Sequence, residues 1–134
     1  MTEMTPRKAS CSCGRLTVTT TAEPVRISIC HCTDCQRRTG SVFGVQARFQ
    51  SSAVTIDGAS TRWTRTADSG NTIDHHFCPV CGSTVFYRPS AEPELVAVAV
   101  GAFADASFPA PGVSVYEARR HPWVALPDDI DHVR

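Results

Sequence analysis

Short segments of alternating or β-branched residues follow one another along this chain, and apolar positions almost never recur at a helical spacing. These segments lie at residues 16–21, 25–29, 43–49, 54–57, 61–66, 72–77, 84–87, 95–100 and 113–117. β-branched and aromatic residues with a period of two are typical of strands. We therefore expect an all-β protein whose short strands are joined by turns every few residues.

Two regions carry more specific expectations for the sheet. Residues 61–66 and 72–77 flank Ser69-Gly70-Asn71, a sequence that favours a turn, so this stretch predicts a hairpin. Residues 95–100 read LVAVAV and are almost continuously apolar. Such a run is typical of a central strand that is buried on both faces.

One stretch departs from the β pattern. Residues 32–39 predict a single short helical turn, and Gly40 directly after them is suited to end it. Residues 102–113 are rich in Ala, Gly and Pro, so they predict a loop before the last strand. The chain is thus expected to contain at most one short helical element.

The length of the chain indicates the number of domains, and its charge indicates which classes of partner to expect. The chain has 134 residues, with 13 Lys plus Arg balanced by 13 Asp plus Glu. This is a usual size for one domain, and we expect a flexible N-terminus at residues 1–10 followed by a single domain at 11–134. A net charge of zero predicts neither a nucleic-acid partner nor a membrane surface as partner. The N-terminus lacks the apolar core of a secretory signal, and no run approaches the roughly 18 to 20 apolar residues of a membrane span, so we expect a cytoplasmic protein with reduced thiols.

Cysteine spacing is the strongest chemical signal. The odd number of cysteines, seven, argues against a complete disulfide framework. Their tight clustering favours metal ligation over buried free thiols. The three clusters are Cys11-Ser12-Cys13, Cys30-His31-Cys32-Thr33-Asp34-Cys35 and Cys78-Pro79-Val80-Cys81.

The two outer pairs predict a closed structural site. Cys11, Cys13, Cys78 and Cys81 supply the four thiolates of a tetrahedral zinc ion that would join distant parts of the chain. A glycine follows each pair, and it permits the tight turn that aims backbone amides at a metal-bound sulfur. A zinc ion held this way contributes on the order of 10 kcal/mol to folding.

The middle triplet predicts a second, catalytic zinc site. Cys30, Cys32 and Cys35 leave one coordination position for water or a substrate thiol. Strand alternation would turn His31 away from the sulfurs. A more distant histidine is the alternative that would close the site, the candidates being His75, His76, His121 and His132.

Arg37 and Arg38 follow the triplet directly. Their guanidinium groups are candidates to bind substrate carboxylates, and the alternative is that both are exposed on the helical turn. Zinc would hold a bound thiol as its thiolate, or it would polarise a carbonyl oxygen as a Lewis acid.

Three ordered motifs resemble those of the glutathione-dependent formaldehyde-activating enzyme (GFA) family. They are Cys-x-Cys-Gly at 11–14, Cys-His-Cys-x-x-Cys-x-x-x-x-Gly at 30–40 and Phe-Cys-x-x-Cys-Gly at 77–82, with Pro122-Trp123 similar to a C-terminal signature. The resemblance implies a β-tent fold of several small antiparallel sheets held by two zinc ions. It also implies that the triplet is the catalytic zinc site and the two pairs the structural one.

The implied activity is that of a carbon–sulfur lyase. A small-molecule thiol such as glutathione would add to a small aldehyde such as formaldehyde, giving S-hydroxymethylglutathione, or the adduct would be cleaved. The alternative is a non-catalytic binding module in which both zinc ions are structural. A third hypothesis, thiol storage or redox sensing by the triplet, ranks behind these two.

Overall fold

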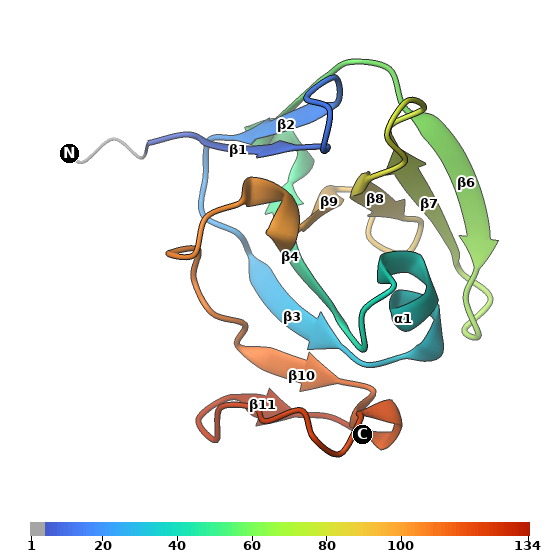
Figure 1. Ribbon diagram of the computed structural model, residues 1–134, viewed down its shortest axis with the longest axis vertical. Helices are drawn as coiled ribbons and strands as arrows, with labels where there is room; N and C mark the ends of the chain where they lie inside the picture. The colour runs from blue at the N-terminus through green and yellow to red at the C-terminus, as the bar shows by residue number, and fades with distance from the viewer. Residues whose placement is uncertain (1–4) are drawn as a thin grey trace.

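The computed structural model of the chain describes residues 5–134, and strands are its main secondary structure, as the alternation predicts (Figure 1). In chain order the strands are β1 (Arg7–Ser10), β2 (Thr17–Thr20), β3 (Arg26–Cys30), β4 (Gly44–Gln50), β5 (Val54–Asp57), β6 (Thr61–Thr66), β7 (Thr72–Phe77), β8 (Thr84–Pro89), β9 (Leu95–Ala99), β10 (Val113–Val115) and β11 (Asp131–His132).

Helical structure is confined to short pieces. The described chain has one α-helix, α1 (Thr33–Thr39), where the sequence predicts its single helical turn. Cys32 caps the N-terminus through its sulfur, and Gly40 ends the helix in the left-handed conformation with φ 72°. Three 3₁₀ turns complete the set: η1 (Ser51–Ala53), η2 (Val100–Phe103) and η3 (Glu117–Arg119).

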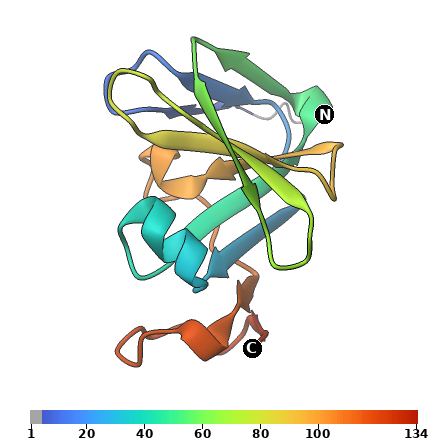
Figure 2. The ribbon, with the colours of Figure 1, turned by 90° about the vertical axis from the view of Figure 1, so that its right-hand side faces the viewer.

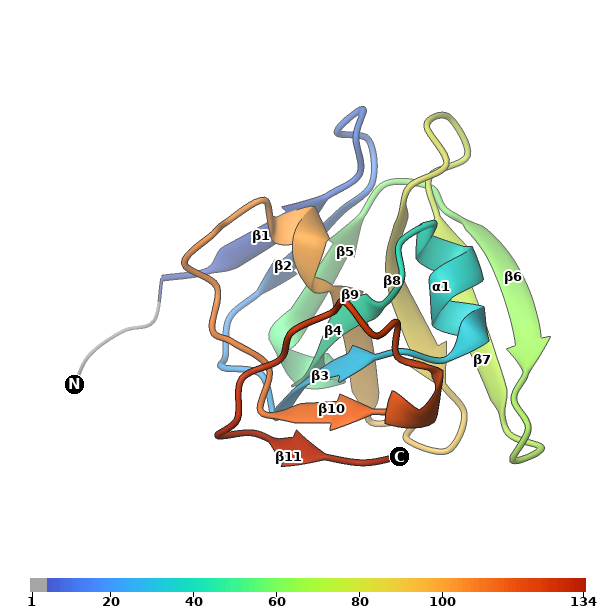
Figure 3. The same cartoon turned by 60° about the horizontal axis from the view of Figure 1, so that its bottom comes forward.

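The strands form two sheets. The smaller has the order β1-β2-β5, and the larger has the order β11-β10-β3-β4-β9-β8-β7-β6. Most neighbours are antiparallel, including the expected β6–β7 hairpin and the expected central strand β9. Strand β10 differs, because it pairs in parallel with both β3 and β11 (Figure 3).

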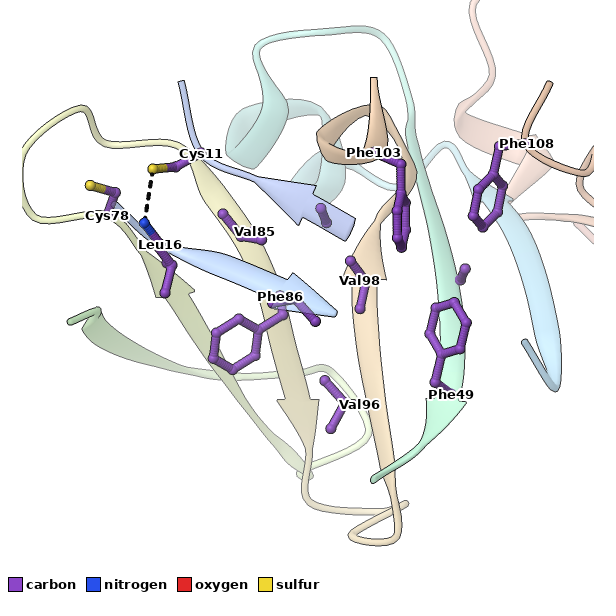
Figure 4. Packing of buried hydrophobic residues seen from close by; sticks show 13 residues of the cluster. Cys11, Leu16, Phe49, Cys78, Val85, Phe86, Val96, Val98, Phe103 and Phe108 are labelled. Atoms are coloured by element: carbon purple, nitrogen blue, oxygen red, sulfur yellow. Dashed lines mark hydrogen bonds between the residues drawn. The ribbon is translucent and has the colours of Figure 1, made fainter. Parts of the chain in front are cut away.

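The hydrophobic core lies between the two sheets. Strand β2 lies across β8 and β9, and side chains from both sheets meet there (Figure 4). Phe49 is fully buried and contacts Phe103, with ring centroids 6.2 Å apart. Truncating a buried phenylalanine to alanine typically costs about 3–5 kcal/mol, so this layer supplies much of the stability.

The other face of the large sheet is polar and positions the functional site. On β3, Arg26, Ser28 and Cys30 alternate with residues that face the core, and on β4 their neighbours include Gln46 and Arg48. All five line one cavity. Helix α1 follows β3 directly and lies between the end of that strand and the β6–β7 hairpin (Figures 1 and 2).

The start of the domain differs from the expected boundary. Residues 7–10 fall within the segment predicted to be a flexible N-terminus, yet they form β1 and pair with β2 along its whole length. Ala9 in this strand is fully buried, which explains why it is held in place. Residues 1–4 of the predicted tail lie outside the described residues. The described part of the chain has no helix with the length and apolar character needed to cross a bilayer.

Candidate metal centres and adjoining cavity

Four cysteines from two distant turns form the first cluster. Cys11 and Cys13 lie on the turn between β1 and β2, and Cys78 and Cys81 lie on the turn between β7 and β8. The Cys11 and Cys13 sulfurs are 3.7 Å apart, and those of Cys13 and Cys78 are 3.6 Å apart. A tetrahedron with zinc–sulfur bonds of about 2.3 Å has edges of about 3.8 Å, so the spacing of the sulfurs fits a zinc ion.

The two turns of this cluster are built alike. Gly14 and Gly82 follow the two pairs and adopt φ values of 84° and 80°, a conformation that favours glycine. Their amides donate to the carbonyl oxygens of Cys11 and Cys78, respectively. The glycines that the sequence predicts to permit tight turns therefore do so.

Backbone amides approach the sulfurs of this cluster. Leu16 N–H donates to Cys11 Sγ at 3.2 Å, a bond drawn in Figure 4, and Val80 N–H donates to Cys78 Sγ at 3.4 Å. Amide donors of this kind stabilise thiolates, which is the form that binds metal. Hydrogen bonds from the Ser83 backbone and then its hydroxyl lower the pKa of Cys81 to about 5.

Three cysteines from one short segment form the second cluster. Cys30 ends β3, Cys32 is the N-cap of α1, and Cys35 lies in the first turn of that helix. Their sulfurs all lie within 4.8 Å of one another. In residues 5–134 no further cysteine, histidine, aspartate or glutamate ligand atom joins this group within that distance.

The histidines proposed as a fourth ligand lie elsewhere or have other partners. His76 hydrogen-bonds Ser60, His121 bonds Gln36, and His132 bonds Glu117. His75 lines the cavity without joining the cysteines. His31, which the sequence predicts to turn away from the sulfurs, is buried and its Nε2 lies 2.9 Å from the hydroxyl of Ser114.

Charge in the three-sulfur cluster concentrates on Cys32. Hydrogen bonds from Cys30 and then Cys35 lower the pKa of Cys32, and the backbone N–H of Cys35, 3.3 Å from its sulfur, acts in the same direction. The hydrogen bond to Cys32 raises the pKa of Cys30. The cluster is therefore predisposed to hold negative charge beside a cation, as a metal-binding thiolate group requires.

A cavity of about 390 Å³ adjoins the three-sulfur cluster, and it is lined by all three of its cysteines. His75 and Tyr87 lie on its wall, with ring centroids 5.4 Å apart. Burial is the main cause that lowers the pKa of His75 to about 4 and raises that of Tyr87 to about 12. Both side chains are neutral at pH 7. The sequence indicates His75 only as a candidate metal ligand, and its local pattern gives no sign that Tyr87 lines a cavity.

The two predicted substrate-binding arginines are placed differently. Arg38 lines the cavity, with Nη2 3.9 Å from Cys35 Sγ and its guanidinium 5.7 Å from the centre of the Tyr87 ring. Arg37 is exposed and does not line the cavity. A third arginine, Arg65 of β6, binds Asp34 of α1 at 2.9 Å and so links the hairpin to the helix.

These features define a class of small β proteins with one four-cysteine cluster at the edge of the core and one three-cysteine cluster beside a cavity. Both clusters can hold metal ions, and their donor sets are consistent with zinc. A comparison with protein families matches residues 6–119 to the family described as glutathione-dependent formaldehyde-activating enzyme. The chain belongs to this family. The Pro122-Trp123 pair lies beyond the matched region.

The fold has a solved counterpart. The crystal structure of a Rhodobacter sphaeroides protein, a structural genomics target, is similar to this chain with a TM-score of 0.56. The two are 24% identical, and the match covers 71% of this chain and 85% of that one. This likeness concerns the fold alone. A search of the curated proteins gave no match.

Proposed function

We propose that this protein is a zinc-dependent carbon–sulfur lyase that forms or cleaves the adduct of a small thiol and a small aldehyde. It would hold two zinc ions per chain: one on Cys11, Cys13, Cys78 and Cys81, and a catalytic one on Cys30, Cys32 and Cys35. The observation that carries the proposal is the three-sulfur cluster, without a fourth protein ligand in the described chain, on the wall of a cavity. The family name supports glutathione and formaldehyde as the reactants, and we expect a cytoplasmic location.

The reaction needs no oxidant or reductant. In the forward direction a sulfur–carbon bond forms between thiol and aldehyde, and the thiol proton ends on the former carbonyl oxygen; cleavage reverses both changes. When bound, zinc would favour the thiolate form of a thiol and polarise a nearby carbonyl. The described residues give the three-sulfur cluster no fourth protein ligand, which is consistent with a position for that thiol.

The residues of the cavity would act on the two ends of the adduct. Arg38, near Cys35, carries a positive charge that would offset negative charge on sulfur or bind a carboxylate. His75 and Tyr87 are neutral at pH 7 because burial disfavours their charged forms. They would therefore serve as hydrogen-bond partners for the adduct oxygen rather than as charged groups.

The proposal is tested by measuring zinc content together with turnover of S-hydroxymethylglutathione. We expect two zinc ions in the wild type, and one zinc ion with a folded chain in Cys32→Ser. The variant should lose at least about a hundredfold in kcat/KM, because the catalytic metal is lost. Ser41→Ala, an exposed position just beyond α1, is the control and should match the wild type.

Cobalt(II) in place of zinc gives a second measurement that does not depend on the correct substrate. Addition of 2-mercaptoethanol should change the cobalt absorption of the wild type, since a fourth sulfur would enter the open position, and leave that of Cys32→Ser unchanged. A single zinc ion in the wild type, or a cobalt spectrum insensitive to thiols, would refute the lyase proposal. The second result would favour the alternative, a binding module in which both metals are structural.

A further inference from the structure

Two arginines lie side by side at the end of the cavity floor away from the cysteines. Arg26 of β3 and Arg48 of β4 are direct cross-strand partners, and both line the cavity. Arg26 is four residues before Cys30 on the same strand. At about 3.3 Å per residue, its Cα lies about 13 Å from that of Cys30.

This pair carries a cost that nothing in the described chain offsets fully. Like charges on directly opposed residues of antiparallel strands are destabilising. Arg48 is largely buried, and its Nε lies 3.3 Å from Glu92 Oε1 without a hydrogen bond to any group of the described chain. Arg26 is exposed and has no ion-pair partner within residues 5–134. A bound anion would supply a partner for Arg26 and a hydrogen-bond acceptor for Arg48 beside its ion pair with Glu92.

A buried acceptor lies between this pair and the cysteines. Gln46 is 4% exposed and lines the cavity, and its Oε1 has no hydrogen-bond partner in residues 5–134. Its cross-strand partner Ser28 lies on β3 midway between Arg26 and Cys30, two residues from each. An unpaired buried carbonyl oxygen is costly, and an N–H group on a ligand would satisfy it.

The charges of the cavity disfavour a ligand that carries its own ammonium group. Five arginines line the cavity against two aspartates. Asp34 is already bound by Arg65, and Asp68 is exposed on the loop between β6 and β7. The described lining therefore offers no buried, unpaired carboxylate to receive an ammonium group, whereas it offers several cations to receive carboxylates.

We propose that Arg26 and Arg48 form an anion subsite, and that the protein prefers an amide-containing thiol adduct with a carboxylate at that subsite and no free ammonium group. The sulfur would lie at Cys30, Cys32 and Cys35, an assignment that rests on the proposed function. The amide N–H would meet Gln46, and the distant carboxylate would lie between the two arginines. Glutathione, whose γ-glutamyl end carries an ammonium group, would then be a poorer ligand than its N-acylated form.

Calorimetry on the zinc-loaded protein with two probes tests this proposal. The probes are S-methylglutathione and N-acetyl-S-methylglutathione, which differ in the ammonium charge and its acetyl cap and have no thiol to bind metal. We expect the N-acetyl probe to bind the wild type more tightly than S-methylglutathione does. Arg26→Gln should weaken its binding about tenfold, the loss expected for one charge-assisted hydrogen bond. Removing one of two opposed charges should leave the fold intact, which thermal unfolding checks.

Arg62→Gln is the matched control, because Arg62 is an exposed arginine of β6 that does not line the cavity. Its binding of the N-acetyl probe should equal that of the wild type. The proposal is overturned if Arg26→Gln behaves like Arg62→Gln, if the wild type does not prefer the N-acetyl probe, or if it binds neither probe. Such failure is separate from failure of the lyase proposal, since 2-mercaptoethanol and cobalt report on the open metal position alone.

Discussion

The two cysteine clusters use the same ligand in opposite settings. In the four-sulfur cluster, Cys11 and Cys78 are buried members of the hydrophobic core, and the sulfurs come from turns 65 residues apart. In the three-sulfur cluster all ligands lie within residues 30–35, and all of them line the cavity. A metal in the first cluster joins two distant turns through the core, whereas a metal in the second faces space that a ligand can enter. On the proposed function, position relative to the core, more than ligand type, distinguishes the structural metal site from the catalytic one.

The largest difference should appear in stability. Cys78→Ser removes a core ligand of the site that ties the β1–β2 turn to the β7–β8 turn, so we expect it to lower the free energy of unfolding by about 5 kcal/mol or more. A loss of that size leaves little of the marginal stability of a domain. Urea unfolding followed by circular dichroism, with zinc present, measures it.

Cys32→Ser is the matched variant for this measurement. Helix α1 keeps other attachments, namely the Arg65–Asp34 ion pair and the bonds from the Gln36 amide to the carbonyl oxygens of His31 and Arg119 at 2.8 and 3.3 Å. We therefore expect a loss of only about 1–2 kcal/mol, as for an ordinary point substitution. Equal destabilisation by the two variants would show that the clusters do not divide these roles.

A smaller difference, in kcat/KM, is expected between substitutions of the two neighbouring arginines of α1. Arg38 lines the cavity near Cys35, and Arg37 does not. Arg38→Gln should lower kcat/KM for the thiol adduct about tenfold, corresponding to about 1.4 kcal/mol, while Arg37→Gln should change it less than about twofold. Steady-state kinetics on the two purified variants would check this. Equal losses of kcat/KM in the two variants would mean that the positive charge of the helix, rather than contact with Arg38 in the cavity, accounts for the effect on the substrate.

The cysteine spacing was enough to group the sulfurs correctly, because ligands two or three residues apart must lie close together whatever the surrounding fold. Alternation likewise located most strands and the hairpin at residues 61–77. The short strand β1 was missed because its four residues, RKAS, carry little apolar signal; it is held by pairing with β2 and burial of Ala9.

The cavity could not be predicted in the same way. It depends on which strands are neighbours, and the pairing of β3 with β4 is what brings Arg26 beside Arg48 and Ser28 beside Gln46. In the sequence Tyr87 looks like an ordinary apolar strand residue. Only the pairing of β8 with β7 brings its ring against His75. Local patterns thus found the candidate metal ligands, because the members of each pair or triplet are close in sequence. They missed the wall of the cavity, because pairing between distant strands assembles it.

The smallest expected effect concerns pH at the edge of the large sheet near the cavity. The hydrogen bond that His132 donates to Glu117 raises the pKa of His132 above its ordinary 6.5. Hydrogen bonds to Glu117, led by the one that Ser114 donates, lower the pKa of Glu117 below its ordinary 4.5. The stabilisation of the folded state by protonated His132 is therefore complete below about pH 6.5, and it is lost as pH rises through the raised pKa. The stabilisation by ionised Glu117 is lost at acid pH, as the carboxylate becomes protonated. The Val133 amide donates to the Ser114 carbonyl oxygen at 2.8 Å, and its protection against hydrogen exchange should fall as pH rises above about 6.5, after correction for intrinsic rates. Amides of β1, beside the four-sulfur cluster, should not change, and in His132→Gln the pH dependence at Val133 should vanish; if it persists there, another group controls this strand.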